Sequence, residues 1–280
     1  MNRRKSFENQ VVWITGASSG IGEALALAFA KRGAKLILSA RSTEKLEALA
    51  QKCKEMAADT SDAIALTLDV TDEASLAGKT KAAWFTFGQV DLLINNAGIS
   101  QRSSFLTTSM ETYRTLFEVD VFGQIALTKA VVPLMIEQGF GHVAVTASVA
   151  GKVGAPFRTG YCAAKHAVMG FFDALRTEVT DKNIEVTTIT PGYIRTSISE
   201  NALTGDGKAF GKVDSNIGKG MSADDCAEVI ISKMEKGVAE IPVGKGMEMV
   251  ALKIKRWFPT LLLKMANGMY KKAAKENDFE

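Results

Sequence analysis

The sequence is poor in cysteine and histidine, and this scarcity argues against disulfide-stabilised and metal-binding proteins. Among 280 residues there are three cysteines and two histidines. Three widely spaced cysteines (Cys53, Cys162 and Cys226) fit neither a disulfide framework nor a zinc motif. We therefore expect them to be buried, reduced thiols. The histidines, His142 and His166, have no cysteine or carboxylate at ligand spacing, so no metal site is predicted.

Excess charge and long apolar runs are also lacking. The formal net charge is only +3, and no basic block with interleaved aromatic residues precedes the last quarter of the chain, so nucleic-acid binding is not predicted. No run reaches the ~18 apolar residues of a membrane span. The first apolar run, residues 11–14, is shorter than the roughly 7–15 apolar residues of a secretory signal. A cytoplasmic protein is predicted.

The sequence does contain short apolar runs that alternate with helical patterns. The alternation predicts an α/β fold, a doubly wound parallel sheet with helices on both faces. Its ligand crevice should lie at the carboxyl ends of the strands. The predicted strands are Val11–Thr15, Lys35–Ser39, Ile64–Leu68, Val90–Ile94, His142–Ala147 and Glu185–Thr190. The predicted helices are Gly22–Lys31, Thr43–Met56, one from about Asp72, Met110–Gln138 and Thr159–Thr180.

The rest of the chain is expected to complete a single domain over residues 1–280. Residues 196–220 are rich in glycine, serine and asparagine, and predict a substrate lid. Ser222 and Asp225 resemble a capping box that starts a helix. Residues 247–275 mix apolar and basic residues and predict a helical extension in which Pro259 breaks or starts a helix. Two interpretations stay open for its apolar face: burial against the lid or a partner subunit, and peripheral contact with a membrane.

A glycine-rich turn joins the first strand to the first helix. Its glycines let backbone amides approach a pyrophosphate, and the helix N-terminus favours negative charge. Arg41 follows the second strand, with no acidic residue between Lys35 and Thr43. Arginine suits the 2′-phosphate of NADP, whereas an acid would suit NAD, so NADP(H) is predicted. The candidate cofactor residues are Gly16, Ser18, Ser19, Gly20, Ile21, Gly22, Arg41, Asp69, Val70, Asn96, Ala97 and Gly98.

Three further residues point to proton transfer. Tyr161 and Lys165 lie one turn apart on a predicted helix. Tyrosine is a poor base at neutral pH, but a nearby ammonium stabilises its phenolate, so the pair can exchange a proton with a substrate oxygen. Ser148, at the end of the fifth predicted strand, opens onto the same crevice and can donate a hydrogen bond to that oxygen.

In this order along the chain, these motifs and Pro191-Gly192 resemble the short-chain dehydrogenase/reductase family. Residues 149–163 are similar to its dehydrogenase/reductase member 7 branch. The resemblance implies a seven-stranded Rossmann sheet, a homodimer or homotetramer, and hydride transfer between nicotinamide and a carbonyl or secondary alcohol.

The resemblance also implies residue roles. Tyr161 would protonate the carbonyl oxygen, Ser148 would hold it, and Lys165 would bind the nicotinamide ribose and stabilise the phenolate. Asp120 stands where the family usually has asparagine, within the catalytic group. Its backbone carbonyl can still hold a water, but its ionised side chain cannot donate a hydrogen bond. The nicotinamide end would be held by Pro191, Gly192, Ile194 and Thr196.

The leading hypothesis is an NADP(H)-dependent carbonyl reductase or alcohol dehydrogenase with a small-molecule substrate. Apolar residues such as Phe157, Ile198 and Phe210 favour a lipophilic substrate. Two alternatives stay open. One is a non-catalytic NADP(H)-binding regulatory protein, which the departure at Asp120 leaves open. The other is an NAD-linked alcohol dehydrogenase.

Overall fold

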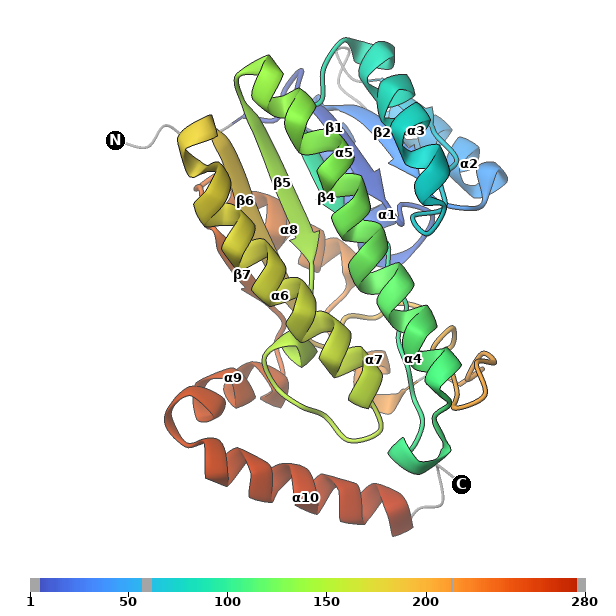
Figure 1. Cartoon of the computed structure of the whole chain (residues 1–280), viewed down its shortest axis with the longest axis vertical. Coiled ribbons are helices and arrows are strands. Elements are labelled where there is room, and N and C mark those ends of the chain that lie inside the picture. Colours follow the sequence, from blue (N-terminus) through green and yellow to red (C-terminus); the bar gives the residue numbers. More distant parts are fainter. Residues whose placement is uncertain (1–5, 57–61, 213, 276–280) are drawn as a thin grey trace.

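The computed structural model describes residues 6–56, 62–212 and 214–275. Seven parallel strands form one sheet in the order β3-β2-β1-β4-β5-β6-β7 (Figure 1). The order reverses between β1 and β4, which is where doubly wound sheets form their ligand crevice. The predicted α/β fold is confirmed. The strands are β1 (Val11–Thr15), β2 (Lys35–Ser39), β3 (Ala63–Ala65), β4 (Leu92–Asn95), β5 (Gly141–Thr146), β6 (Ile184–Pro191) and β7 (Glu240–Val243).

Helices cover both faces of the sheet, and each face has its own core (Figure 1). Burial on both faces explains why the strands read as continuous apolar runs. One face packs against α1 (Gly20–Ala30), α2 (Thr43–Met56) and α8 (Ala223–Met234). The other packs against α3 (Glu73–Phe87), α5 (Gly123–Gln138) and α6 (Thr159–Val179).

Several predicted boundaries were wrong by one or more residues. Strand β3 starts at Ala63 and ends at Ala65, because it is an edge strand that pairs only with β2. Beyond it, Leu66 and Leu68 still donate backbone hydrogen bonds, but regular pairing has ended. Strand β4 begins two residues later than predicted and α1 two residues earlier. The sequence had not located β7, a four-residue edge strand containing Pro242.

The helical stretch predicted over Met110–Gln138 is confirmed, and it contains one wide turn. It consists of α4 (Met110–Phe117), a π-helical turn η2 (Glu118–Phe122) and α5. In the π turn, the N–H of Gly123 donates to the carbonyl of Glu118, five residues back. Among the described residues, Met110–Gln138 alone is long and apolar enough to span a membrane, but it is half buried and packs on α3 and β5. It is a core helix.

The predicted lid and the C-terminal extension lie at the carboxyl ends of the strands (Figure 1). In the predicted lid, Leu203 bridges to Gln101 and Ala209, and α7 (Ser215–Gly218) follows. Ser222 caps α8 by accepting from the N–H of Asp225 at 3.1 Å, as its capping pattern predicted. Residues 247–275 form α9 (Met247–Trp257) and α10 (Pro259–Lys275), with Pro259 as the first residue of α10. Figure 1 shows this pair of helices lying apart from the sheet.

Candidate active site

A single cavity of about 910 Å³ runs from the glycine-rich turn to α10. It lies at the carboxyl ends of the strands, where the topology places a ligand crevice. All the predicted catalytic and cofactor residues line it except Gly22 and Asp120. These two residues lie behind its wall. Counting the segment of Asp120, the structure brings together predicted residues from eight separate segments of the chain.

The glycine-rich turn is packed tightly against the loop after β4. Gly16 has φ +63°, and a Cβ there would lie 2.8 Å from Cα of Ala97. A Cβ on Gly22 would lie 2.3 Å from the carbonyl oxygen of Gly16, so Gly22 is required for packing rather than for lining the cavity. The side chain of Asn96 donates to the carbonyl oxygens of Thr15 (3.1 Å) and Gly16. The turn and the floor of the cavity therefore form one rigid unit.

The residues at this end of the cavity fit a dinucleotide. Ser19 makes no side-chain cap hydrogen bond at the start of α1. The first amides of a helix have no intrahelical partner and favour a phosphate group. The glycines keep side chains out of this space.

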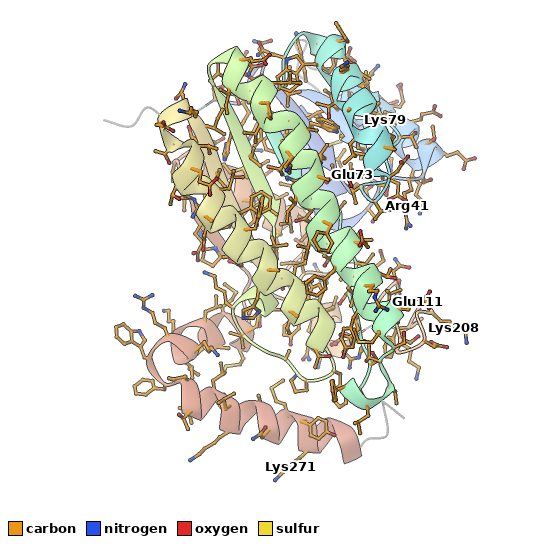
Figure 2. The ribbon with its side chains drawn as sticks, viewed as in Figure 1. Arg41, Glu73, Lys79, Glu111, Lys208 and Lys271 are labelled. Carbon is orange, nitrogen blue, oxygen red and sulfur yellow. The ribbon has the colours of Figure 1, made fainter. Side chains whose placement is uncertain are left out.

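Two cations line the same end of the cavity, Arg41 and Lys45 (Arg41 is labelled in Figure 2). The sequence reasoning missed Lys45, which lies four residues after Arg41 in the first turn of α2. The available signal was a lysine in the first turn of the helix that follows Arg41. Arg41 also acts on Asp69: burial would raise the pKa of this carboxyl, but two hydrogen bonds from Thr71 and the charge of Arg41 lower it.

Ser148, Tyr161 and Lys165 lie in the middle of the cavity wall. Ser148 follows β5, and its Oγ accepts from the N–H of Ala150 at 3.1 Å and donates to the carbonyl of Pro191 at 3.4 Å. Tyr161 is buried near the start of α6. The Nζ of Lys165 lies 5.7 Å from the centre of the Tyr161 ring. The arrangement offers two hydroxyl groups and one ammonium to a bound ligand.

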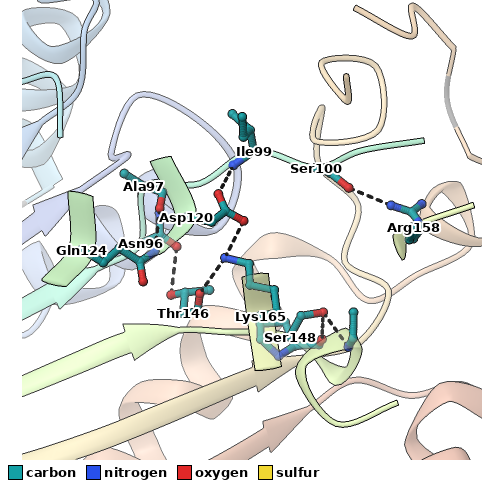
Figure 3. A network of polar contacts seen from close by, with 12 residues as sticks. Asn96, Ala97, Ile99, Ser100, Asp120, Gln124, Thr146, Ser148, Arg158 and Lys165 are labelled. Atoms are coloured by element: carbon teal, nitrogen blue, oxygen red, sulfur yellow. Dashed lines mark hydrogen bonds and ion pairs between the residues drawn. The ribbon is translucent and has the colours of Figure 1, made fainter. Parts of the chain in front are cut away.

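The ammonium of Lys165 belongs to a buried polar network (Figure 3). Its Nζ donates to the carbonyl of Thr146 at 3.2 Å and forms an ion pair with Oδ2 of Asp120 at 3.3 Å. Oδ1 of Asp120 accepts from the N–H of Ile99 at 2.7 Å. A Cβ on Gly98 would lie 3.1 Å from Oδ1 of Asp120 and 3.2 Å from Nζ of Lys165, so any larger residue would require these groups to shift slightly.

Burial and pairing set the charges of this network. Burial raises the pKa of the Asp120 carboxyl, against the opposing effect of Lys165. Burial alone would lower the pKa of Lys165, but the charges of Asp120 and Tyr161 raise it above its ordinary value. Lys165 is therefore a cation at neutral pH.

A second charged cluster joins the lid to the start of α6. No local pattern predicts it, because its members are far apart in the chain. Asp214 in the lid pairs with Arg102 and, at 3.2 Å, with Arg158. Arg158 also donates to Oγ of Ser100 at 2.8 Å (Figure 3). Burial would raise the pKa of Asp214, but its backbone hydrogen bond from Asn216 and the two arginines lower it.

The apolar part of the cavity differs from the sequence expectation. Ile198 lines it, but Phe157 stacks on Tyr270 at 5.3 Å and Phe210 lies under Arg102. The apolar lining comes instead from the 3-10 turn η3 (Val149–Gly151), the residues after it, and the C-terminal helices. The residues concerned are Val149, Val153, Ala251, Ile254, Leu262, Met265 and Met269.

The cysteines and histidines lie outside this chemistry. Cys53, Cys162 and Cys226 are buried free thiols. His142 bonds to Oγ1 of Thr187 and His166 to the carbonyl of Cys162. Within residues 6–56, 62–212 and 214–275, no three His, Cys, Asp or Glu side chains come close enough together to hold a metal ion.

Comparison with known proteins decides the family. The short chain dehydrogenase profile matches residues 10–206, which include the glycine-rich turn, Ser148, Tyr161 and Lys165. The chain belongs to the short-chain dehydrogenase/reductase family. It is 39% identical over 278 residues to dehydrogenase/reductase SDR family member 7B of Bos taurus, covering 98% of this chain and 86% of that one. The predicted resemblance, including the member 7 branch, is confirmed.

Solved structures of family members agree. Levodione reductase superposes with a TM-score of 0.77 at 30% identity, covering 87% of this chain and 99% of that one. A short-chain dehydrogenase from Sphingobium yanoikuyae in complex with NADPH gives a TM-score of 0.73 at 28% identity, covering 83% and 87%. Membership of the short-chain dehydrogenase/reductase family makes the chain an oxidoreductase that uses a nicotinamide cofactor.

Proposed function

We propose that the chain is an NADP(H)-dependent reductase of lipophilic carbonyl compounds, or a dehydrogenase of the corresponding secondary alcohols. One observation carries the proposal: Ser148, Tyr161 and Lys165 lie on one cavity, between an end that fits a dinucleotide and an end lined by apolar side chains. When bound, the nicotinamide supplies or accepts the hydride.

The three residues can move the proton that accompanies the hydride. In reduction, the Tyr161 hydroxyl donates its proton to the carbonyl oxygen. The Ser148 hydroxyl holds the same oxygen, because its 3.4 Å bond to the Pro191 carbonyl is long and easily exchanged. The cationic Lys165 stabilises the phenolate that remains and can bind a ribose hydroxyl of the cofactor. The nicotinamide end would be held by Pro191, Gly192, Ile194 and Thr196, which line the adjacent wall.

The preference for NADP(H) is supported by Arg41 and Lys45. Both cations line the dinucleotide end, and the relative from Sphingobium yanoikuyae is in complex with NADPH. A guanidinium can bind a 2′-phosphate by two charge-assisted hydrogen bonds. Titration of NADPH and NADH against the protein tests this preference. Tighter binding of NADH would favour the NAD-linked alcohol dehydrogenase instead.

The substrate class is supported by the apolar lining of the cavity. Turnover of a series of aliphatic and aromatic ketones with NADPH should increase with apolar size, because each buried methylene contributes about 0.8 kcal/mol. Tight NADPH binding without turnover of any carbonyl or alcohol would favour the non-catalytic regulatory alternative.

We also propose a homo-oligomer in the cytoplasm that makes peripheral membrane contact. Exposed apolar side chains on α4, η2 and α5 (Met110, Phe122 and Ile136) support a subunit interface. Three buried free thiols suit a reducing compartment. Exposed apolar and basic residues on α9 and α10 support the membrane contact. Light scattering after size exclusion measures the oligomeric state.

A further inference from the structure

The turn between α9 and α10 exposes three large apolar side chains. Trp257 is 69% exposed, Phe258 63% and Leu261 49%; we call these three residues the hairpin tip. The inner face of α10 is different, because Leu262, Met265, Ala266 and Met269 line the cavity. One face of α10 is therefore buried against the cavity, as one of the two interpretations of this extension expects. The hairpin tip is not covered by any of the described residues.

Positive charge flanks the hairpin tip and continues along α10. The exposed cations on α9 and α10 are Lys253, Lys255, Arg256, Lys264 and Lys271. Lys271 points away from the protein on the outer side of α10 (Figure 2). The guanidinium of Arg256 lies 5.7 Å from the Trp257 ring. Between residues 247 and 271 the one acid is Glu248, which turns inward to accept from the N–H of Gly246 at 3.1 Å.

We propose that the hairpin tip inserts into the interfacial region of an anionic lipid bilayer. Tryptophan is enriched at the boundary between lipid and water. Apolar side chains flanked by lysine and arginine bind there through apolar burial and attraction to anionic headgroups. A second copy of this chain is a poorer occupant, because two hairpin tips would bring like charges together. This docking specifies the partner in the membrane contact proposed for the chain, and it does not depend on the reaction.

Vesicle sedimentation tests the docking. The wild-type protein should sediment with phosphatidylcholine vesicles that contain phosphatidylserine, and less with phosphatidylcholine alone. The double variant Trp257→Ser/Phe258→Ser should bind at least about tenfold more weakly, since two large apolar side chains are removed from the lipid. Phe85→Ser is the matched control, because Phe85 is 86% exposed on α3, far from the hairpin tip. Equal losses in the two variants would overturn the proposal.

Charge reversal separates the electrostatic contribution. Lys253→Glu and Lys264→Glu should each weaken binding to the anionic vesicles by roughly 30-fold, because each reversal removes an attraction of about 1 kcal/mol and adds a comparable repulsion. Added salt should weaken wild-type binding in the same direction. Binding that changes neither with added salt nor with the phosphatidylserine content of the vesicles would rule out the anionic surface as the partner.

Fluorescence locates the insertion. Of the three tryptophans, Trp13 is fully buried and Trp84 is half-buried against the core, so the exposed Trp257 should give most of any blue shift when vesicles are added. Trp257→Phe should keep the binding and lose the shift. Vesicle binding of the wild-type protein without a blue shift in its fluorescence would contradict insertion. A hairpin-tip variant that changed the oligomeric state while vesicle binding stayed intact would also contradict it. NADPH-dependent turnover without vesicles should be equal in all these variants, so failure of docking and failure of the proposed reaction are distinguishable.

Discussion

The carboxylate of Asp120 lies 3.3 Å from the ammonium of Lys165, and both groups are buried. The π turn places Asp120 there, and the resemblance to the family leads one to expect an asparagine at this position. The chain therefore has an ion pair beside its proposed proton-transfer group. Breaking a buried pair leaves an uncompensated charge, so the pair should affect both the free energy of unfolding and the pH dependence of activity.

Replacing Asp120 by asparagine should shift the alkaline side of the pH profile. The pKa of Lys165 is raised above its ordinary value of 10.5, so its proton stabilises the fold fully below that pH, and this contribution is lost as the pH rises through the raised value. Asp120→Asn removes the charge that raises this pKa, so activity should fall at lower pH than in the wild type. At neutral pH the rate should change by less than about tenfold, or ~1.4 kcal/mol.

Measuring kcat and kcat/KM from neutral to alkaline pH in both proteins checks this expectation. An unchanged alkaline limb would show that Asp120 does not set the charge of Lys165. A large loss at neutral pH would show instead that the carboxyl group takes part in the reaction.

Replacing Tyr161 by phenylalanine should abolish turnover and leave NADPH binding nearly intact, because only the transferable proton is removed. A general acid or base contributes about 10²–10⁴ in rate. Ser148→Ala should lower kcat as well, because it removes a donor to the substrate oxygen. Stopped-flow turnover and equilibrium NADPH titration measure the two effects. Near-wild-type turnover of Tyr161→Phe would refute the mechanism.

Replacing Arg41 by alanine should weaken NADPH binding by about 10- to 150-fold, the equivalent of a charge-assisted hydrogen bond of roughly 1.5–3 kcal/mol. NADH binding should change little. Lys45→Ala should act in the same direction but less, because an ammonium is a single point of charge. Lys52→Ala is a suitable control, since Lys52 is exposed on the same helix and does not line the cavity. Equal losses for both cofactors would mean that Arg41 does not contact the 2′-phosphate.

Replacing Asp214 by alanine should loosen the lid, because it leaves Arg102 and Arg158 without their shared carboxylate. We expect a higher KM and a free energy of unfolding lower by about 3 kcal/mol. Asp206→Asn is the matched control, since its pair with Lys208 is exposed in the same lid. The pKa of Asp214 is lowered below its ordinary 3.8, so its contribution in the wild type should disappear as the pH falls through that lowered value. Denaturant unfolding and initial rates of both variants provide the test.

The sequence was most informative where local pattern and tertiary structure agree. The first two strands have the predicted bounds because β1 and β2 are almost wholly buried, and burial produces a clear apolar run. The positions of Ser148 and Tyr161 on one cavity could also be predicted, because parallel strands end at the same edge of a sheet. The fold and the family followed from these features.

The unpredicted features depend on contacts between distant residues. The ion pair of Asp120 and Lys165 depends on an extra residue in a helix, which leaves no mark in the apolar periodicity. The clustering of Arg102 and Arg158 around Asp214 arises only when the lid folds back over the start of α6. The short strand β7 has too few residues, and a proline among them, to give a strand signal.

The wide turn at Glu118–Phe122 sets the rotational phase between two helices. One residue added to an α-helix turns everything beyond it by about 100°. On the far side, Tyr113 bonds to Thr159 at 2.8 Å and packs so closely on Gly160 that a Cβ there would lie 2.7 Å from its ring. The side of α4 that braces the first turn of α6 thus depends on the register of the π turn. The wide turn therefore directs two groups inward together: the carboxylate of Asp120 towards Lys165, and the ring of Tyr113 towards the helix that carries Tyr161.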